Sequence, residues 1–466
     1  MIPILTKSPR FPLPAVLAIF GGALAACFLA FPRDDAFITF RYAERIAEGL
    51  GFTYQAGENV IGTSTPLWTL ILAMVARLGW PVGVAAAWLG VWFHALAIGI
   101  LGRTLERVSG RPAAWIGAAL LAVNPPSAAI AASGMESGLV ECLVTAGLAS
   151  VVFRRTGWGA VIAALMVLTR VDLLPLSILI LTANYLSSPR SIIRNVLIFI
   201  SIALPWFAWS WATTGSPLPH SIPAKLAFYA SRGWSNGHIA LGWPVSDPLR
   251  AALCFSGLVG AVQLRRSPVA CLAAWPVIHL VALGYSGTWI HEWYLTPLYP
   301  AVFFFAAVAV CRITSRSDDR GWITVALAII VLVLGSNRVR AAREDWADAT
   351  DRLLDCHGAA ADFISAHRRT GETVACGDIG LIGYRTRAPI LDTVGLVSPS
   401  VLPFLADDDP ASIYRTLRPD WAVIATYGPD HERVLADPDF VADYAEHARF
   451  VFDEDRTYIV FRLVDA

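Results

Sequence analysis

The chain has 466 residues, of which 56% are hydrophobic and only 15% are charged. Soluble domains carry about 25% charged residues, so this composition excludes an ordinary soluble enzyme. The formal net charge of +0, from 36 basic and 36 acidic residues, excludes a strongly basic nucleic-acid-binding protein. This zero is a sum of two unlike parts. Residues 1–336 hold 22 Lys and Arg against 13 Asp and Glu (+9), and residues 337–466 hold 14 against 23 (−9).

The apolar segments of residues 1–336 approach or exceed the about 20 residues that a membrane-spanning helix needs. We expect a polytopic α-helical membrane protein with about eleven transmembrane helices, followed by a C-terminal soluble α/β domain in residues 337–466. The expected spans are Phe11–Phe31, Thr65–Trp80, Val82–Leu105, Pro112–Ala131, Glu136–Phe153, Trp158–Tyr185, Ile192–Thr213, Pro248–Leu264, Pro268–Tyr285, Tyr294–Ile313 and Trp322–Ser336.

Basic residues at the two ends indicate the orientation. Lys7 and Arg10 precede the first span, so the positive-inside rule places the N-terminus in the cytoplasm. Eleven crossings then place residues 337–466 outside. Leu24-Ala25-Ala26-Cys27 matches a bacterial lipoprotein cleavage signal, but we expect the first span to be retained, because the residues after it form a membrane-anchored loop.

The first outer loop begins with two adjacent carboxylates, Asp34 and Asp35. In the following segment, Ala36–Leu50, the apolar side chains share one helical face and the charged side chains, including Arg41, share the opposite face. This pattern predicts an amphipathic helix lying along the membrane interface. Two interpretations of the carboxylates are equally supported. One is a general base or metal ligand, and the other is an N-cap paired with Arg33.

Two further outer loops carry candidate polar groups. The second contains His220 and Lys225, and Lys225 is one of only two lysines in a chain with 34 arginines. Lysine offers a compact charge suited to a phosphate, although a solvated loop cation is the commoner situation. The third loop brings His291, Glu292 and Tyr294 to a span boundary, where they are either belt residues or ligand contacts.

The expected spans also hold ionisable groups. Glu136 lies at the start of one span, and intramembrane carboxylates are functional candidates. Arg170 and Asp172 interrupt Trp158–Tyr185, which we therefore expect to be broken or re-entrant, and the two side chains are close enough in sequence to pair with each other.

The C-terminal domain contains Cys356 and Cys376, for which a disulfide and two separate thiols are equally compatible with the sequence. We expect two helices in Asn337–Arg369. Expected strands are Thr373–Asp378, Pro389–Val394, Trp421–Thr426, Arg449–Phe452 and Tyr458–Leu463. Trp421 and Tyr384 are expected in the core rather than on a glycan.

Short segments distributed over most of the chain resemble one known group of proteins. The run from Asp34 to Ala43 and the run from Gly62 to Trp68 resemble the first loop of GT-C glycosyltransferases, nearest to the arabinofuranosyltransferase-type bacterial branch. Other matching pieces follow in the expected order: Ser133-Gly134-Met135-Glu136, Pro205-Trp206, Pro219-His220-Ser221 with Ala224-Lys225, Gly377-Asp378-Ile379-Gly380, Gly383-Tyr384 and Leu391–Leu396. The sequence departs at His220, where Asn is usual, and at Arg170-Val171-Asp172.

The resemblance implies inverting glycosyl transfer from a polyprenyl-phosphate-linked sugar to a cell-envelope glycan or lipid acceptor. The reaction would occur at the outer face of a bacterial cytoplasmic membrane. By the resemblance Asp34, followed by Asp35, is the catalytic carboxylate, and a divalent cation at this pair is an option. Lys225 and Arg41 would bind the donor phosphate. The substrate-binding candidates are His220, His291, Glu292, Tyr294 and Glu136. The alternatives are a flippase for lipid-linked sugars and a non-catalytic glycan-binding membrane protein.

Overall fold

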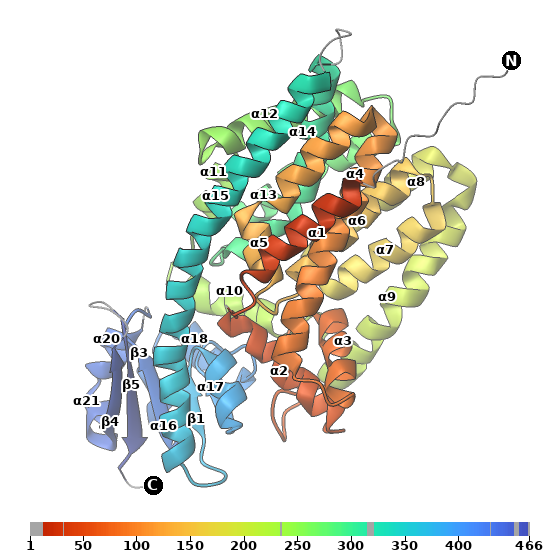
Figure 1. Cartoon of the computed structure of the whole chain (residues 1–466). Coiled ribbons are helices and arrows are strands. Elements are labelled where there is room, and N and C mark those ends of the chain that lie inside the picture. The colour runs from red at the N-terminus through yellow and green to blue at the C-terminus, as the bar shows by residue number, and fades with distance from the viewer. Residues whose placement is uncertain are drawn as a thin grey trace, which may run out of the picture.

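The computed structural model of the chain describes residues 13–30, 32–233, 235–314, 321–428, 430–451 and 456–464. Lys7 and Arg10, on which the predicted orientation of the first span depends, lie outside the described residues. A helical bundle forms the larger part of the molecule, and a sheet with covering helices forms a cap at one end (Figure 1).

The bundle is built from helices of very different lengths. In chain order they are α1 (Leu13–Ala26), α2 (Asp34–Ala47), α3 (Pro66–Arg77), α4 (Val82–Ala122), α5 (Pro125–Ala131), α6 (Ser137–Val152), α7 (Thr156–Thr169), α8 (Leu174–Ser187), α9 (Ile192–Thr214), α10 (Ser221–Ser231), α11 (Gly237–Gly242), α12 (Pro248–Gln263), α13 (Ala274–Gly284), α14 (Tyr299–Thr314) and α15 (Gly321–Leu353).

Three stretches of the described chain are long and apolar enough to cross a membrane: Val82–Ala122, Pro189–Thr214 and Glu292–Ile313. A fourth is added if Gly237–Val245 and Pro248–Gln263, which meet at a bend of 77°, form one broken span. Other expected spans form shorter apolar helices. The 12 residues of α3, for example, rise only about 18 Å. The number of eleven spans therefore stays a prediction.

Helix α4 contains a sharp reversal. Ser109 and Gly110 have non-helical backbone angles, and Gly110 has a φ of 80°, which glycine adopts without strain. A Cβ built on Gly117 would lie 2.1 Å from the Leu105 side chain, so the segments on either side of the reversal pack against each other. The reversal lies between the expected spans Val82–Leu105 and Pro112–Ala131, although the second is divided between the end of α4 at Ala122 and α5, which begins at Pro125.

The break expected within Trp158–Tyr185 is present. Helix α7 ends at Thr169, a short 3₁₀ turn covers Val171–Leu173, and α8 follows. The Ser177 hydroxyl on α8 donates to the Ala163 carbonyl on α7 at 2.9 Å, so the two helices form a close pair on either side of Arg170.

The cap is a mixed five-stranded sheet with the order β2-β1-β3-β5-β4. Its strands are β1 (Val374–Cys376), β2 (Ile390–Asp392), β3 (Trp421–Ala425), β4 (Tyr444–Val451) and β5 (Thr457–Leu463), which correspond to the five expected segments. Strand β1 runs parallel to both β2 and β3, and β5 is antiparallel to β3 and β4. The covering helices are α16 (Ala359–His367), α17 (Ile379–Thr386), α18 (Leu402–Ala406), α19 (Ala411–Leu417), α20 (His431–Leu435) and α21 (Pro438–Asp443).

Alternate strand residues point to opposite faces of this sheet, and a separate core covers each face. On one face Val374 and Cys376 pack with Ile364 of α16 and Ile382 of α17. On the other face Ala375 packs with residues of α18 and α19, including Leu405 and Ile413. Trp421 is fully buried, as expected, and its indole N–H donates to Glu372 at 2.8 Å.

No linker separates bundle and cap at residue 337. Helix α15 continues from the bundle through Asn337 to Leu353, and a π-helical turn over Leu354–Gly358 joins it to α16 (Figure 1). The change in composition near residue 337 therefore lies inside one continuous helix. Cys356 and Cys376 do not form a disulfide, and both thiols are buried, with Cys356 donating to the Phe450 carbonyl at 3.7 Å.

Candidate functional site

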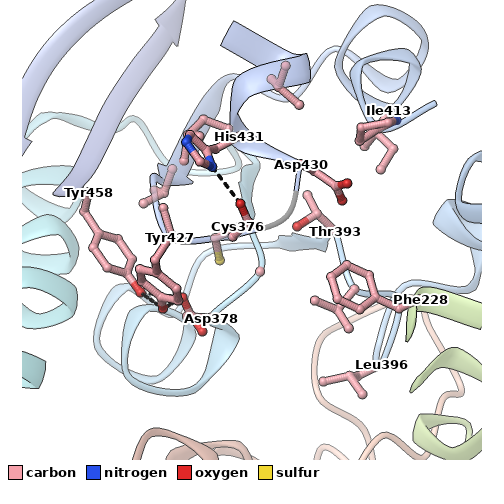
Figure 2. A pocket seen from close by; sticks show the side chains of 18 of the residues that line it. Phe228, Cys376, Asp378, Thr393, Leu396, Ile413, Tyr427, Asp430, His431 and Tyr458 are labelled. Atoms are coloured by element: carbon pink, nitrogen blue, oxygen red, sulfur yellow. Dashed lines mark hydrogen bonds between the residues drawn. The ribbon is translucent and has the colours of Figure 1, made fainter. Parts of the chain in front are cut away.

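A cavity of about 390 Å³ lies where the cap meets the bundle. Its bundle side is lined by Asp35, Lys225 and His291 together with aromatic side chains of α10 and the third outer loop. Its cap side is lined by residues that follow β1, β2 and β3, among them Asp378, Thr393 and Tyr427 (Figure 2). We call this space the outer cavity.

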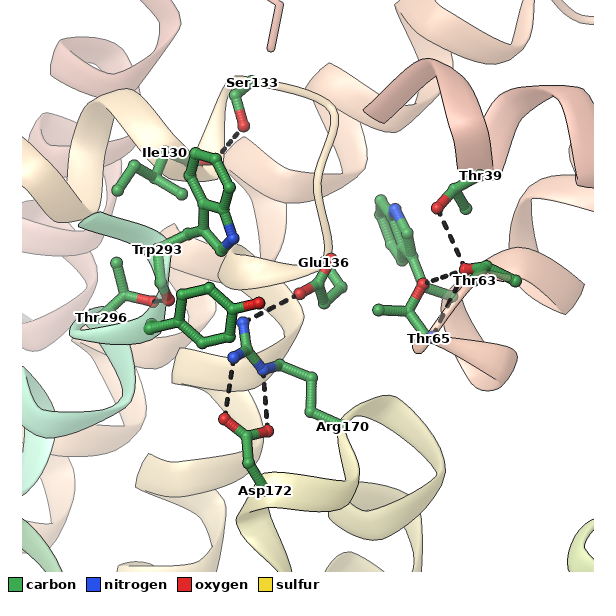
Figure 3. Close-up of polar contacts among 12 residues, drawn as sticks. Thr39, Thr63, Thr65, Ile130, Ser133, Glu136, Arg170, Asp172, Trp293 and Thr296 are labelled. Atoms are coloured by element: carbon green, nitrogen blue, oxygen red, sulfur yellow. Dashed lines mark hydrogen bonds and ion pairs between the residues drawn. The ribbon is translucent and has the colours of Figure 1, made fainter. Parts of the chain in front are cut away.

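A second cavity of about 70 Å³ lies on the other side of Asp35 and Lys225, toward the bundle, and we call it the inner cavity. Among the residues that the structure describes, only Asp35, Lys225 and Leu396 line both spaces. The inner cavity is otherwise lined by polar groups such as Thr63, Glu136 and Arg170, several of which Figure 3 shows. The Asp35 and Lys225 side chains therefore stand at the boundary between an inner and an outer compartment.

Lys225 is the cation of this boundary. Its ammonium group lies 3.4 Å from the hydroxyl of Tyr294, a candidate substrate-binding residue. Burial alone would lower the pKa of Lys225, but Tyr294 and Asp35 outweigh it and raise that pKa above its ordinary value. Lys225 is thus a positive charge at physiological pH, held beside a carboxylate and a hydroxyl.

His291 lines the outer cavity close to the same charges. Its ring stacks on Trp293, with centroids 4.2 Å apart. Burial lowers the pKa of His291 to about 4, because the positive charges of Lys225 and Arg33 add to desolvation and the Asp35 carboxylate only partly opposes them. The imidazole is therefore neutral near pH 7.

This neutral His291 predicts a pH dependence of stability. Between about pH 6.5 and pH 4 the unfolded chain binds a proton at His291 that the folded chain does not, so stability falls as the pH falls. A His291→Gln variant should lose that part of the slope. Thermal unfolding of both proteins in detergent across this range checks it, and equal slopes would contradict the assignment.

Asp34 is not in the cavity, although it precedes Asp35 directly. Its carboxylate accepts hydrogen bonds from the backbone N–H groups of Gly380 at 3.1 Å and Leu381 at 2.8 Å, in the first turn of α17. The His357 ring lies 3.2 Å from the same carboxylate. The Asp34 carboxylate thus binds the N-terminus of the cap helix α17, where a negative charge is favourable, and this contact attaches α2 to the cap.

Arg41 has a similar anchoring geometry. Its guanidinium donates to the carbonyls of Gly383 and Ala388, both at 2.8 Å, and lies over the Tyr54 ring. Arg41 lines neither cavity in the described chain, and its phosphate contact stays a prediction. Tyr384 packs against Phe37, and its hydroxyl donates to Glu44 of α2.

Helix α2 is therefore a joint between bundle and cap rather than a helix lying free at the interface. Its apolar residues, such as Ala36 and Phe40, are buried in the bundle core. The charged face, with Arg41 and Glu44, meets α17 of the cap. This double attachment fixes the position of Asp35 at the start of the helix.

Glu136 belongs to a buried ionic cluster at the inner cavity. Arg170 donates to the Glu136 carboxylate at 3.2 Å and, through two nitrogens, to Asp172 at 3.0 and 2.8 Å (Figure 3). The Arg170 guanidinium also lies 4.8 Å from the centre of the Tyr294 ring. The expected Arg170–Asp172 pair is present, and Glu136 is its third member.

The other two substrate-binding candidates lie elsewhere. His220 donates its backbone N–H to Ile61 at 2.8 Å, and its buried Nε2 finds no hydrogen-bond partner among the described residues. Glu292 is exposed. Neither side chain lines the outer or the inner cavity as far as the structure describes them.

The residues that could hold a divalent cation do not converge. Within the described ranges no three His, Cys, Asp or Glu side chains form a metal-sized group, and the Asp34 carboxylate is engaged with α17. The described side chains around Asp34 and Asp35 therefore do not form a set of ligands for the suggested cation.

The sequence did not indicate the cap side of the outer cavity as a site. Asp378, Thr393, Tyr427 and Tyr458 line it, together with His431. A usable signal was present, because Gly377-Asp378 and Thr393-Val394 are the last two residues of the predicted strands Thr373–Asp378 and Pro389–Val394. Ligands in open α/β sheets bind beyond the carboxyl ends of parallel strands.

Comparison with known proteins addresses the fold. No curated protein matches the sequence, and a family model described as a domain of unknown function (DUF8728) matches residues 345–461. ArnT from Cupriavidus metallidurans in the apo state is 14% identical with a TM-score of 0.63, over 96% of this chain and 97% of that chain. The same protein bound to undecaprenyl phosphate gives 0.60, with 14% identity and the same coverage. An Archaeoglobus fulgidus oligosaccharyltransferase, in complex with Zn and sulfate, gives 0.54 at 13% identity over 93% and 72%.

Both neighbours are GT-C superfamily members, and the match to ArnT extends over bundle and cap together. At this identity the likeness concerns the fold and leaves the arabinofuranosyltransferase-type branch as an expectation. The chain therefore shares the fold of ArnT and of the Archaeoglobus fulgidus oligosaccharyltransferase.

Proposed function

We propose that this protein transfers a glycosyl group from a polyprenyl-phosphate-linked sugar to an envelope glycan or lipid at the outer face of a bacterial cytoplasmic membrane. The observation that carries the proposal is the placement of Asp35 and Lys225 at the boundary between the inner and outer cavities. A carboxylate and a cation flanking one space are what attack by a hydroxyl and departure of a phosphate require.

The reaction would be a single displacement that inverts the anomeric centre. The acceptor oxygen forms a bond to the anomeric carbon and gives its proton to the Asp35 carboxylate. The bond from that carbon to the phosphate oxygen breaks, and its electron pair stays on the phosphate. Lys225 offsets the charge that develops there, and the Tyr294 hydroxyl, 3.4 Å from its ammonium, orients it.

The neighbouring protein bound to undecaprenyl phosphate supports the donor class, because this chain shares its fold over almost the whole length. A lipid-linked donor enters from the bilayer, so a site at the helix ends is appropriate. The cap then lies on the outer side, as the orientation predicted from the sequence requires. The transferred group is a hexosyl or a pentosyl group.

A Lys225→Met variant tests the donor half of the proposal. We expect kcat/KM for a polyprenyl-phosphate sugar to fall about 100-fold, as removal of one preorganised charge donor does in other enzymes. The assay measures release of polyprenyl phosphate by purified protein in detergent. Arg190→Met, which removes an exposed cation between α8 and α9, is the matched control and should keep full activity.

Two results would contradict this proposal. One is wild-type turnover that Lys225→Met does not change. The other is movement of the sugar lipid across liposomes containing the wild-type protein with no transfer product, which would favour a flippase.

A further inference from the structure

We infer that the cap side of the outer cavity is the acceptor subsite, and that it selects an uncharged, hydroxyl-rich glycan over an anionic one. This inference rests on the proposed function and specifies its acceptor. It concerns the crevice formed by the segments after β1, β2 and β3, which we call the cap crevice; its polar lining residues are Asp378, Thr393, Tyr427, Asp430, His431 and Tyr458.

The topology of the cap places a crevice at this edge. Strands β2 and β3 lie on opposite sides of β1 and run parallel to it. The chain leaves β1 for one neighbour and then crosses to the other, so the helices that follow β1 and β2 cover opposite faces. Such a switch point leaves a gap beyond the carboxyl ends of the strands, which is where open α/β sheets bind ligands.

The central polar group of the cap crevice is the Asp378 carboxylate. The Tyr427 hydroxyl lies 2.6 Å from its Oδ2, and the Tyr458 hydroxyl also donates to Oδ2 (Figure 2). Both bonds use one oxygen, so Oδ1 accepts no hydrogen bond from the part of the chain that the structure describes. A carboxylate oxygen beside aromatic rings is suited to accept hydrogen bonds from sugar hydroxyls.

A chain of hydrogen bonds holds this carboxylate in position. The His357 Nε2 lies 2.7 Å from the Tyr458 hydroxyl, and its Nδ1 lies 3.2 Å from Asp34. Burial disfavours a charged His357, but the hydrogen bond to Asp34 and the charges of Asp34 and Asp378 raise its pKa above the ordinary value. The Tyr458 hydroxyl therefore lies between the His357 ring and the Asp378 carboxylate, to which it donates.

The charges around the cap crevice disfavour an anion. Among the described lining residues that the cap contributes there are two carboxylates, Asp378 and Asp430, and no Lys or Arg. Asp430 is already paired with Arg232. A phosphate or uronate in the cap crevice would face the Asp378 carboxylate without a compensating cation from the described cap lining, and burying such a like-charge pair is unfavourable.

The position relative to Asp35 fits an acceptor. Asp35 lines the outer cavity together with Asp378, whereas the inner cavity with Arg170 and Glu136 lies on its other side. A glycan in the cap crevice therefore approaches Asp35 from the side opposite the inner cavity. An in-line displacement needs the acceptor and the leaving phosphate on opposite sides of the sugar.

Binding of glycans by the full-length protein tests this inference without donor or turnover. The protein, purified in detergent, is applied to an array of neutral, uronate-bearing and phosphate-bearing oligosaccharides. We expect binding to neutral glycans and a roughly 10- to 100-fold loss of affinity in Asp378→Ala, as expected when hydrogen bonds to a charged group are lost. Asp407→Ala removes an exposed cap carboxylate outside the crevice and should bind as the wild type does.

A Tyr427→Phe variant is a second test in case Asp378→Ala misfolds, since it removes one hydroxyl and keeps the ring. We expect a several-fold loss of affinity for neutral glycans in this variant. No glycan bound by the wild type, a preference for anionic glycans, or unchanged binding in both cap variants would overturn the inference. Glycan binding without any turnover would overturn only the proposed function.

Discussion

An Asp35→Asn variant should lose at least about 100-fold in kcat while the protein remains folded. Positioned general bases contribute about 10²- to 10⁴-fold, and the amide cannot take the proton of the acceptor hydroxyl. Asp35 lines both cavities beside Lys225, so the isosteric change removes charge at the reacting centre with little change in packing. Product formation from a polyprenyl-phosphate sugar, together with thermal unfolding in detergent, measures the two effects separately.

The neighbouring carboxylate supplies the sharpest control. Asp34→Asn removes the charge of the residue next to Asp35. The Asp34 carboxylate, however, contacts the backbone N–H groups of Gly380 and Leu381 and the His357 ring rather than the cavity. We expect a lower stability of the attachment between α2 and the cap, by about 1.5–3 kcal/mol for a charge-assisted contact, and a smaller loss of turnover. Asp35→Asn should therefore lower mainly turnover, and Asp34→Asn should lower mainly stability.

Full activity of Asp35→Asn would remove the general base from the proposal. If Asp34→Asn instead lost turnover at unchanged melting temperature, the carboxylate first indicated by the family resemblance would be the catalytic one. A loss of both activity and melting temperature in Asp35→Asn would point to a structural role for this residue as well.

The choice between Asp34 and Asp35 shows where prediction from the sequence stops. Both residues are adjacent and precede the same helix, so local spacing treats them alike. They are distinguished by α17, more than 340 residues later, whose first N–H groups receive Asp34. Such long-range partners are not encoded in any local pattern, and the same reason explains why Arg41 faces carbonyls of the cap rather than a phosphate.

Elements with strong local periodicity were predicted well. Four of the five cap strands occur where they were predicted, whereas β4 begins at Tyr444, before the predicted start at Arg449. Arg170 lies at the predicted break between α7 and α8, where its buried charge meets carboxylates. The domain boundary was less predictable. Composition changes at residue 337, but α15 carries its helix through that point, because helical backbone bonds form equally in apolar and polar surroundings.

The cap crevice was missed for a different reason. Its polar residues come from the segments after three strands, from α20 and from β5, so only the sheet order brings Asp378 and Tyr427 together. The resemblance had marked Gly377 and Asp378 as part of a signature without a role. Because β1 and β3 are parallel, the loops that follow them lie at the same edge of the sheet. The role that we infer for Asp378 rests on this placement.

Arg170→Met should give the largest loss of stability of any substitution considered. The Arg170 side chain is 6% exposed, its Glu136 partner 5% and its Asp172 partner 33%. Without the guanidinium, Glu136 remains as a buried charge with no counterion. Breaking a buried ion pair in this way costs about 3–5 kcal/mol, and Tyr294, over which the guanidinium lies, loses a contact that positions it beside Lys225.

The stability change can be attributed to the stranded carboxylate by a second substitution. Glu136→Gln placed in the Arg170→Met background removes the uncompensated charge, so the double variant should regain part of the melting temperature lost by the single one. Arg170→Lys keeps the charge but not the two-pronged contact with Asp172, and we expect an intermediate value. Unfolding in detergent measures all three. A double variant no more stable than Arg170→Met would show that shape and packing at this position, rather than the buried charge of Glu136, set the cost.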